Sequence, residues 1–205
     1  MPRSASENSI DSKISRYINR CVTGSVFLPN TFAALGSRAA IDKALQRLVA
    51  DGVLRRLSRG LYDKPQHHEL FGILWPSVNT VIKAIAHKDR IRTQPCGVYA
   101  ENMLGLSDQV PAKVVLLTDG ISRIVKAGPM EIRLQRTTPR QMAAAGRLSG
   151  LVIQAFKSMG IKHITPAHID RLRQRIPASE RAKLIKDLTL APAWMRPLLM
   201  QVARD

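Results

Sequence analysis

The chain has 205 residues, 45% of them hydrophobic, and its 32 Lys and Arg against 15 Asp and Glu give a formal net charge of +17 at pH 7. This hydrophobic content excludes a chain that is disordered throughout, and the apolar runs stop far short of the roughly 20 residues that cross a bilayer. The charge attracts polyanions, so nucleic acid is the expected partner class. A basic solvated surface without a specific ligand, or an acidic protein partner, would fit the same charge.

The N-terminus bears on the compartment of the protein, and the cysteines and histidines bear on metal binding. Residues 1–13, MPRSASENSIDSK, lack the apolar run and cleavage site of a secretory signal, which favours a cytoplasmic protein. Cys21 and Cys96 match no metal or redox spacing, and no Cys or carboxylate clusters around His67 and His68 at metal spacing. We therefore expect no metal and no cofactor.

The first expected element is an amphipathic helix over residues 9–21, SIDSKISRYINRC. Its apolar side chains recur at helical spacing, which places them on one face: Ile10, Ile14, Tyr17, Ile18 and Cys21. Residues 26–27 form a short extended step. Pro29, Asn30 and Thr31 then provide a stop and the start of a helix through TFAAL, which Gly36 ends.

Ser37 supplies the N-cap of the next helix, which runs to about residue 50. Its apolar set fits the 3.6-residue period: Ile41, Ala44, Leu45, Leu48 and Val49. The outward set follows by subtraction: Arg38, Ala39, Asp42, Lys43, Gln46, Arg47 and Ala50. Two helices joined by a short turn containing glycine suit a helix-turn-helix, whose second helix lies in the major groove and offers donors to base edges. An ordinary surface helix with scattered charges would look the same.

The segment VLRRLSRGLYDKP decides between these alternatives. It predicts a strand over residues 53–57, a turn over 58–60 and a return strand over 61–63, with Val53, Leu57 and Leu61 facing the helices. A nucleotide-gripping loop is disfavoured because the segment has one glycine between two strands. Three helices followed by a basic hairpin make a winged helix-turn-helix, whose turn arginine lies along the phosphates or enters a minor groove. The expected DNA-contacting residues are Thr31, Ser37, Arg38, Lys43, Gln46, Arg47, Arg55, Arg56, Arg59 and Lys64.

The remaining chain predicts a mixed α/β module and then helices. Residues 64–76 read as a junction, and Ser77 caps a helix. RIRTQ is a strand, GVYAENMLGL a short helix, and KVVLLTD, SRIVKAG and MEIRLQR three strands joined by turns. Helices follow at about 142–159, 166–175, 178–189 and 193–203. The basic sets in the last helices fit DNA, an acidic partner or plain solvated faces: Arg171, Arg173, Arg175, Arg181, Lys183 and Lys186.

An enzyme of a different class, a metal-dependent nuclease, would need clustered carboxylates. Glu101, Asp108, Asp119 and Glu131 are the candidates, but Asp119 is explained by its turn and Glu131 points outward along a strand. No Ser, Cys or His constellation indicates a nucleophile with its base. We expect a protein without catalytic residues.

The expected fold class is therefore α+β: an N-terminal winged helix-turn-helix over residues 1–66, a mixed α/β module over 67–140, and a C-terminal helical region over 141–205 that packs with the module as one domain. The expected function is that of a sequence-specific regulator of double-stranded DNA, monomeric or weakly dimeric and cooperative on DNA, with no membrane association.

Four stretches resemble a known family: LGSRAAIDKALQRLVADGVLRRLSRGLYDKP, QPCGVYAENMLGLSDQVPAKVVLLTDG, IRLQRTTP and AGRLSGLVIQAF. They resemble the AbiEi-like antitoxins and transcriptional regulators of bacterial type IV toxin-antitoxin systems, in a short form known as a domain of unknown function. The resemblance runs from about residue 10 to the C-terminus.

The resemblance implies a winged helix that represses its own operon and a C-terminal domain that counteracts a nucleotidyltransferase toxin encoded next door. It places Ser37, Arg38, Lys43, Gln46 and Arg47 on the recognition helix, and Arg55, Arg56 and Arg59 on the wing. The DNA target would be the chain's own promoter, with repeated sites. A stand-alone DNA-binding protein without a toxin remains the alternative, as does an antitoxin whose basic charge is incidental.

Overall fold

A computed structural model describes residues 9–109 and 113–204, so the expectation for the N-terminal segment 1–8 and the centre of the QVPAK stretch lie outside the described residues. Helices and small sheets are both present, which confirms a mixed α/β protein. The chain divides into two compact units: residues up to Arg90 with Lys126–Met130, and Ile91–Val125 with the residues from Glu131 on. The first unit extends beyond the boundary expected at residue 66.

The first unit begins with the helices that the apolar spacing predicts. α1 is Ile10–Arg20 and α2 is Arg38–Ala50, and Ser37 caps α2 by accepting a hydrogen bond from the backbone N of Ala40 at 3.3 Å. Between them, Pro29–Leu35 forms a 3-10 helix, η1. It starts at Pro29, and Thr31 lies inside its first turn, where its Oγ1 accepts from the backbone N of Leu28 at 3.3 Å. Thr31 therefore holds the start of η1 together.

Three short strands form a sheet that contains the predicted hairpin. β1 is Val26–Phe27, β2 is Arg55–Ser58 and β3 is Leu61–Asp63, in the antiparallel order β1-β3-β2. Gly60 has φ +69, a value that glycine adopts without strain, so the chain reverses at Arg59 and Gly60. The hairpin is confirmed, although β2 begins two positions later than residue 53 because the chain first leaves α2 through a turn.

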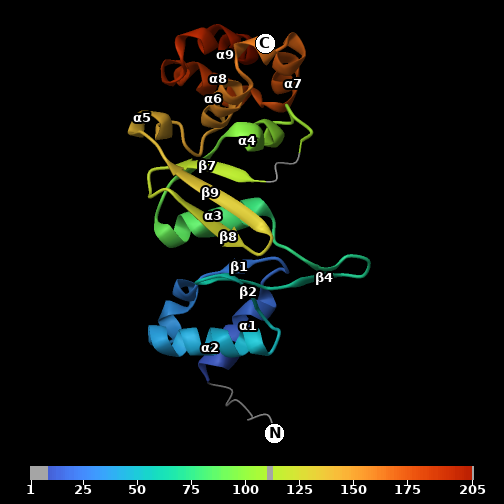
Figure 1. Ribbon diagram of the computed structural model, residues 1–205, viewed down its shortest axis with the longest axis vertical. Coiled ribbons are helices and arrows are strands. Elements are labelled where there is room, and N and C mark those ends of the chain that lie inside the picture. The colour runs from blue at the N-terminus through green and yellow to red at the C-terminus, as the bar shows by residue number, and fades with distance from the viewer. Residues whose placement is uncertain (1–8, 110–112, 205) are drawn as a thin grey trace. The chain divides into compact units, whose positions relative to one another are not determined.

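One core joins α1, α2 and this sheet, and Figure 1 shows the two helices on the same side of the strands. Its strand residues are Phe27 and Tyr62, while Leu54, just before β2, also lies in it and Val53 packs at its edge. The expectation that Leu57 and Leu61 face this core is wrong: both are buried, but outside it. Neighbouring residues of a strand point to opposite faces, so Leu61 lies opposite to Tyr62.

The segment expected as a plain junction contains a second hairpin. β4 is Gln66–His68 and β5 is Gly72–Leu74, and Figure 1 shows this pair reaching out from the rest of its unit. Leu70 and Phe71 at its tip are 83% and 74% exposed. The sequence did not predict this hairpin, because strands are recognised by alternating buried and exposed residues and the apolar residues here are exposed. α3, Val78–Asp89, follows and begins as predicted at the Ser77 cap.

Arg55 connects the two hairpins. Its guanidinium donates to both carboxylate oxygens of Asp63, at 3.0 and 2.5 Å, and Asp63 is fully buried. The same guanidinium donates to the carbonyl oxygen of Leu74 at 2.9 Å and lies 3.9 Å from the ring centroid of Trp75. One side chain thereby pairs β2 with β3 and fixes the base of the β4–β5 hairpin.

A four-stranded sheet organises the second unit, in the order β6-β7-β9-β8. Its strands are β6 Thr93–Pro95, β7 Val114–Thr118, β8 Arg123–Ala127 and β9 Met130–Arg136. All four were expected, but β9 inserts between β7 and β8 and runs parallel to β7. The contacts assign the β8–β9 turn to the first unit, where Gly128 donates to the carbonyl oxygen of Leu57 at 3.3 Å.

Among the described residues, five helices contribute to one apolar core in the second unit: α4 Gly97–Met103, α6 Leu148–Met159, α7 Pro166–Arg175, α8 Ala178–Lys186 and α9 Arg196–Ala203. The short helix α5, Pro139–Met142, precedes α6, and its residues lie outside that core. Short 3-10 segments separate them: η2 Ile161–His163, η3 Leu188–Leu190 and η4 Ala193–Met195. α4 packs on α6, and α7 and α8 pack on α9. The single helix expected over 142–159 is broken, because Gly146 has φ +80 and Arg147 is extended.

Across residues 9–109 and 113–204, we find no helix with the length and apolarity that a membrane span requires.

Replacing Arg55 with Met should lower the free energy of unfolding by about 3 kcal/mol, because the buried Asp63 carboxylate loses its cation. Urea denaturation measures the effect. Arg56→Met is the matched control: Arg56 is the exposed neighbour on the same strand, and its replacement should change stability by no more than about 0.5 kcal/mol. Equal effects of the two variants would contradict the assigned role of Arg55.

Candidate nucleic-acid interface

A hollow of about 290 Å³ lies between α2 and the β2–β3 hairpin in the first unit. Elements that are distant in sequence meet there: α2, the two strands with their turn, and the end of α3. The lining residues are Arg38, Asp42, Gln46, Arg56, Arg59, Gly60, Tyr62 and Lys88. Four of these side chains are cationic and one is a carboxylate, so the hollow is strongly positive. Such a concave, basic surface suits the oxygens of a phosphate backbone.

α2 presents the hydrophilic face that its sequence predicts. Arg38, Lys43, Gln46 and Arg47 are all exposed, while the apolar set packs into the core. Lys43 and Arg47 belong to the same exposed face of α2 but do not line the hollow. Ser37 is exposed at the start of the helix, where its Oγ is already engaged as the cap. The α2 part of the predicted site is therefore assembled on one element, as expected.

Two arginines of α2 are held by carboxylates. Arg38 Nε donates to both oxygens of Asp42, at 3.0 and 2.9 Å, and its Nη1 reaches Asn30 Oδ1 at 3.5 Å. Arg47 donates to Asp11 of α1 from Nε at 2.5 Å and from Nη2 at 2.7 Å. The hydrogen bonds from Arg47 hold the pKa of the Asp11 carboxyl below its ordinary value. Both arginines remain more than half exposed, at 60% and 57%.

Lys88 is a cation of the hollow that sequence reasoning missed. It lies in the last turn of α3, and its Nζ donates to the carbonyl oxygen of Arg59 at 2.5 Å. This bond holds the turn of the β2–β3 hairpin against the end of α3. A basic residue in the last turn of a helix usually signals only a favourable dipole interaction, so the sequence offers no sign of this tertiary contact.

Arg55 and Lys64, which were expected as DNA contacts, do not line the hollow and are engaged within the chain. Arg55 is occupied by Asp63, Leu74 and Trp75. Lys64 Nζ donates to the backbone carbonyl oxygens of Ile18, Asn19 and Cys21, at 3.2, 3.3 and 2.9 Å. It thereby supplies donors to carbonyls at the end of α1, where helical partners run out. Thr31 is exposed but serves η1. Arg56 and Arg59 are exposed in the hollow, as expected.

Basic residues of the C-terminal helices also bind the chain's own backbone. Arg171 donates to the carbonyl oxygen of Gly105 and Arg173 to that of Gln201, each at 2.7 Å. Lys183 pairs with Glu180 at 2.5 Å. The Arg171 and Arg173 bonds tie α7 to other segments of the second unit, whereas the Lys183–Glu180 pair lies within α8. These are structural uses of residues that composition alone counts as a basic face.

Two of the four carboxylates considered for catalysis, Asp119 and Glu131, have cationic neighbours. Asp119 accepts from the backbone N and from Nε of Arg92, each at 2.8 Å, and these bonds hold its pKa below the ordinary carboxyl value. Glu131 lies 4.0 Å from Lys113. Within the described ranges, no group of three or more His, Cys, Asp or Glu side chains is arranged to hold a metal ion.

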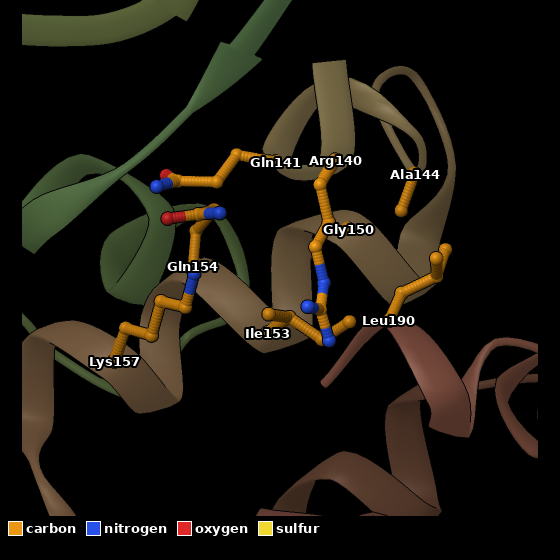
Figure 2. A pocket seen from close by; sticks show the side chains of 8 residues that line it. All are labelled: Arg140, Gln141, Ala144, Gly150, Ile153, Gln154, Lys157 and Leu190. Atoms are coloured by element: carbon orange, nitrogen blue, oxygen red, sulfur yellow. The ribbon is translucent and has the colours of Figure 1, made fainter. Parts of the chain in front are cut away.

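A second, polar hollow lies in the second unit, where α5, α6 and η3 meet (Figure 2). Figure 2 shows Gln141 and Gln154 on one side of it, with Arg140, Ile153 and Leu190 on the other. Its volume of about 10 Å³ is the space of a single water molecule, so it does not take a ligand. A Cβ on Gly150 would stand 2.2 Å from the carbonyl oxygen of Ala144, which makes glycine a packing requirement there.

The fold and its basic hollow define a mixed α/β protein of two units with a candidate polyanion-binding face. The chain belongs to DUF6088, a family of unknown function that matches residues 13–184. It is similar to the crystal structure of the RV2827C protein from Mycobacterium tuberculosis, at 15% identity and a TM-score of 0.49 over 96% of this chain and 76% of that chain. No curated protein matches it.

The Asp11–Arg47 pair should make the α1–α2 contact sensitive to acid. Because the pKa of Asp11 is lowered in the folded state, the pair stabilises the fold above the ordinary carboxyl range and is lost as the pH falls through the lowered value. Asp11→Asn should therefore be less stable than wild type at pH 7, and the difference should close as the pH falls below the ordinary pKa of an aspartate.

Urea denaturation at several pH values measures this difference. Glu69→Gln is the control, since Glu69 is exposed near the tip of the β4–β5 hairpin. A difference between Asp11→Asn and wild type that stays constant with pH would contradict the effect.

Proposed function

We propose that this chain is a sequence-specific double-stranded DNA-binding regulator and that its first unit is a winged helix-turn-helix. In this proposal η1 and α2 are the helix pair, α2 is the recognition helix, and the β2–β3 hairpin is the wing. The observation that carries it is the basic hollow in which the exposed face of α2 meets Arg56 and Arg59 of the hairpin and Lys88 of α3.

The dimensions of DNA support this assignment of roles. The major groove, about 12 Å wide, admits one α-helix, and a helix lying in it has phosphates along both sides. With α2 in the groove, Gln46 and Lys43 on its exposed face are in position to meet base edges. Cations on the hairpin turn then face the adjacent phosphates, which fix orientation without reading sequence.

Lys88 gives the wing a defined position. An isolated hairpin turn is mobile, and ordering it on DNA would cost conformational entropy. The bond from Lys88 Nζ to the Arg59 carbonyl holds the turn before DNA arrives and adds a cation beside it. Arg55 stiffens the same hairpin from its other end through Asp63. The wing is therefore pre-organised, which favours affinity.

Mobility-shift titration over a range of salt concentrations tests the interface. Each cation that contacts a phosphate contributes about 0.9 to the slope of log affinity against log salt, so Arg59→Ala and Lys88→Ala should each reduce the slope by about that amount. The loss should be equal on the chain's own promoter and on random duplex, since phosphate contacts carry no sequence information.

Lys13→Ala is the matched control for this titration, because Lys13 is an exposed lysine on α1 that does not line the hollow. Its slope should equal that of wild type. An unchanged slope for both Arg59→Ala and Lys88→Ala would exclude the hollow as the phosphate contact.

We further propose, on the resemblance to AbiEi-like regulators, that the promoter bound is the chain's own and that the second unit opposes a nucleotidyltransferase toxin encoded next door. The metal-dependent nuclease is the weaker candidate, since Asp119 and Glu131 pair with cations. The test co-expresses the adjacent gene with this chain or with residues 9–90 alone. Rescue of growth by the full chain but not by the fragment is expected, and a non-toxic neighbour would leave the stand-alone regulator.

A further inference from the structure

Asp42 is the carboxylate among the residues that line the basic hollow. It lies on the exposed face of α2, one helical turn after Arg38, and its side chain is 39% exposed. A phosphate placed beside this carboxylate would meet a like charge, and such juxtapositions are costly at an interface. A hollow that only gripped phosphates would gain by having a neutral residue here.

The geometry leaves Asp42 with acceptor capacity. An ionised carboxylate has about four lone-pair positions, and the two contacts from Arg38 Nε occupy one side of the group. Arg38 likewise keeps donors beyond Nε and Nη1, because a guanidinium carries five N–H groups. The pair thus presents an acceptor and donors together at the mouth of the hollow.

The major groove decides what such a pair can meet. Cytosine and adenine each present an amino group there, which donates, whereas the guanine and thymine edges offer acceptors and a methyl group. A carboxylate therefore accepts from cytosine N4 or adenine N6 and is repelled by the acceptor edges of guanine and thymine. The neighbouring arginine suits the O6 and N7 acceptors of guanine.

We propose that Asp42 is a specificity-determining residue, which accepts a hydrogen bond from a base amino group in the major groove and withholds Arg38 from the phosphates. This inference rests on the proposed DNA-binding function and adds to it a division of labour. Arg56, Arg59 and Lys88 supply binding that is independent of sequence, while the Arg38–Asp42 pair penalises the wrong base.

The test selects binding sites from a library of random duplex DNA with the full chain as wild type, Asp42→Asn and Asp51→Asn. Asp51 lies at the C-cap of α2, is exposed and does not line the hollow, so its variant makes the same change of charge on the same helix. Wild type and Asp51→Asn should select one site that contains a base pair with cytosine or adenine facing Asp42.

Asp42→Asn should lose a preference for cytosine at that one base pair, whereas its amide can still pair with N6 and N7 of adenine. Where wild type selects cytosine, the affinity ratio between the selected site and the site changed at that pair should fall from about tenfold to near one. Affinity for random duplex should rise, and the slope of log affinity against log salt should steepen by up to about 0.9 as Arg38 becomes available to a phosphate. Asp42→Ser is the second variant, and it should lose the preference whether wild type selects cytosine or adenine, because a hydroxyl can donate to or accept from any base edge.

The outcomes separate the two proposals. If Asp42→Asn and Asp42→Ser select the wild-type site with an unchanged ratio, Asp42 serves only the helix and the specificity role is overturned, while DNA binding stands. If wild type itself selects no site, the proposed function fails, and the inference fails with it.

Discussion

The buried pair between Arg55 and Asp63 is the interaction on which the first unit depends. A carboxylate without solvent contact is tolerated because a bidentate guanidinium neutralises it. This pairing crosses from β2 to β3, so it sets the position of the hairpin whose turn carries Arg59. The same guanidinium reaches Leu74 and Trp75, and through them it orients the β4–β5 hairpin. One ion pair therefore connects the β2–β3 hairpin of the sheet with the β4–β5 hairpin that follows it.

The fate of the basic residues gives the high net charge its meaning. Lys64 caps α1, Arg171 and Arg173 bind backbone carbonyls, and Arg55 is buried against Asp63. These cations therefore have partners within the chain. Backbone carbonyl groups near helix ends need donors, and the buried Asp63 carboxylate needs a cation. What remains directed to solvent around the hollow is a small set on α2, on the β2–β3 turn and at the end of α3. A polyanion meets this local set, whereas the total charge mainly acts at long range.

Carboxylates neutralise part of this positive charge, and they do so on α2. The exposed face of α2 carries two arginines that are each forked onto an acid, one from the same helix and one from α1. Such pairs add little stability at a surface. In the proposed function, they would weaken the attraction of the arginines to the phosphates of DNA whose bases do not match. The hairpin turn and Lys88 have no such acid among the lining residues apart from Asp42. In the proposed function, α2 would thus recognise the DNA bases, while the hairpin turn and Lys88 would contact the DNA phosphates.

The amino-acid sequence alone was enough to predict the local elements: the period of apolar residues predicted α1, α2 and α3, Ser37 and Ser77 their N-caps, and Gly60 the hairpin turn. These follow from interactions within a few residues, which a sequence displays directly. Other features emerge only when the chain folds: the Lys88–Arg59 bond, the structural contacts of Arg55 and Lys64, the place of β9 beside β7, and the packing of Tyr62 rather than Leu61 in the helical core. Each of these depends on which distant groups meet, and a long, flexible cation carries no mark of the partner that it will find.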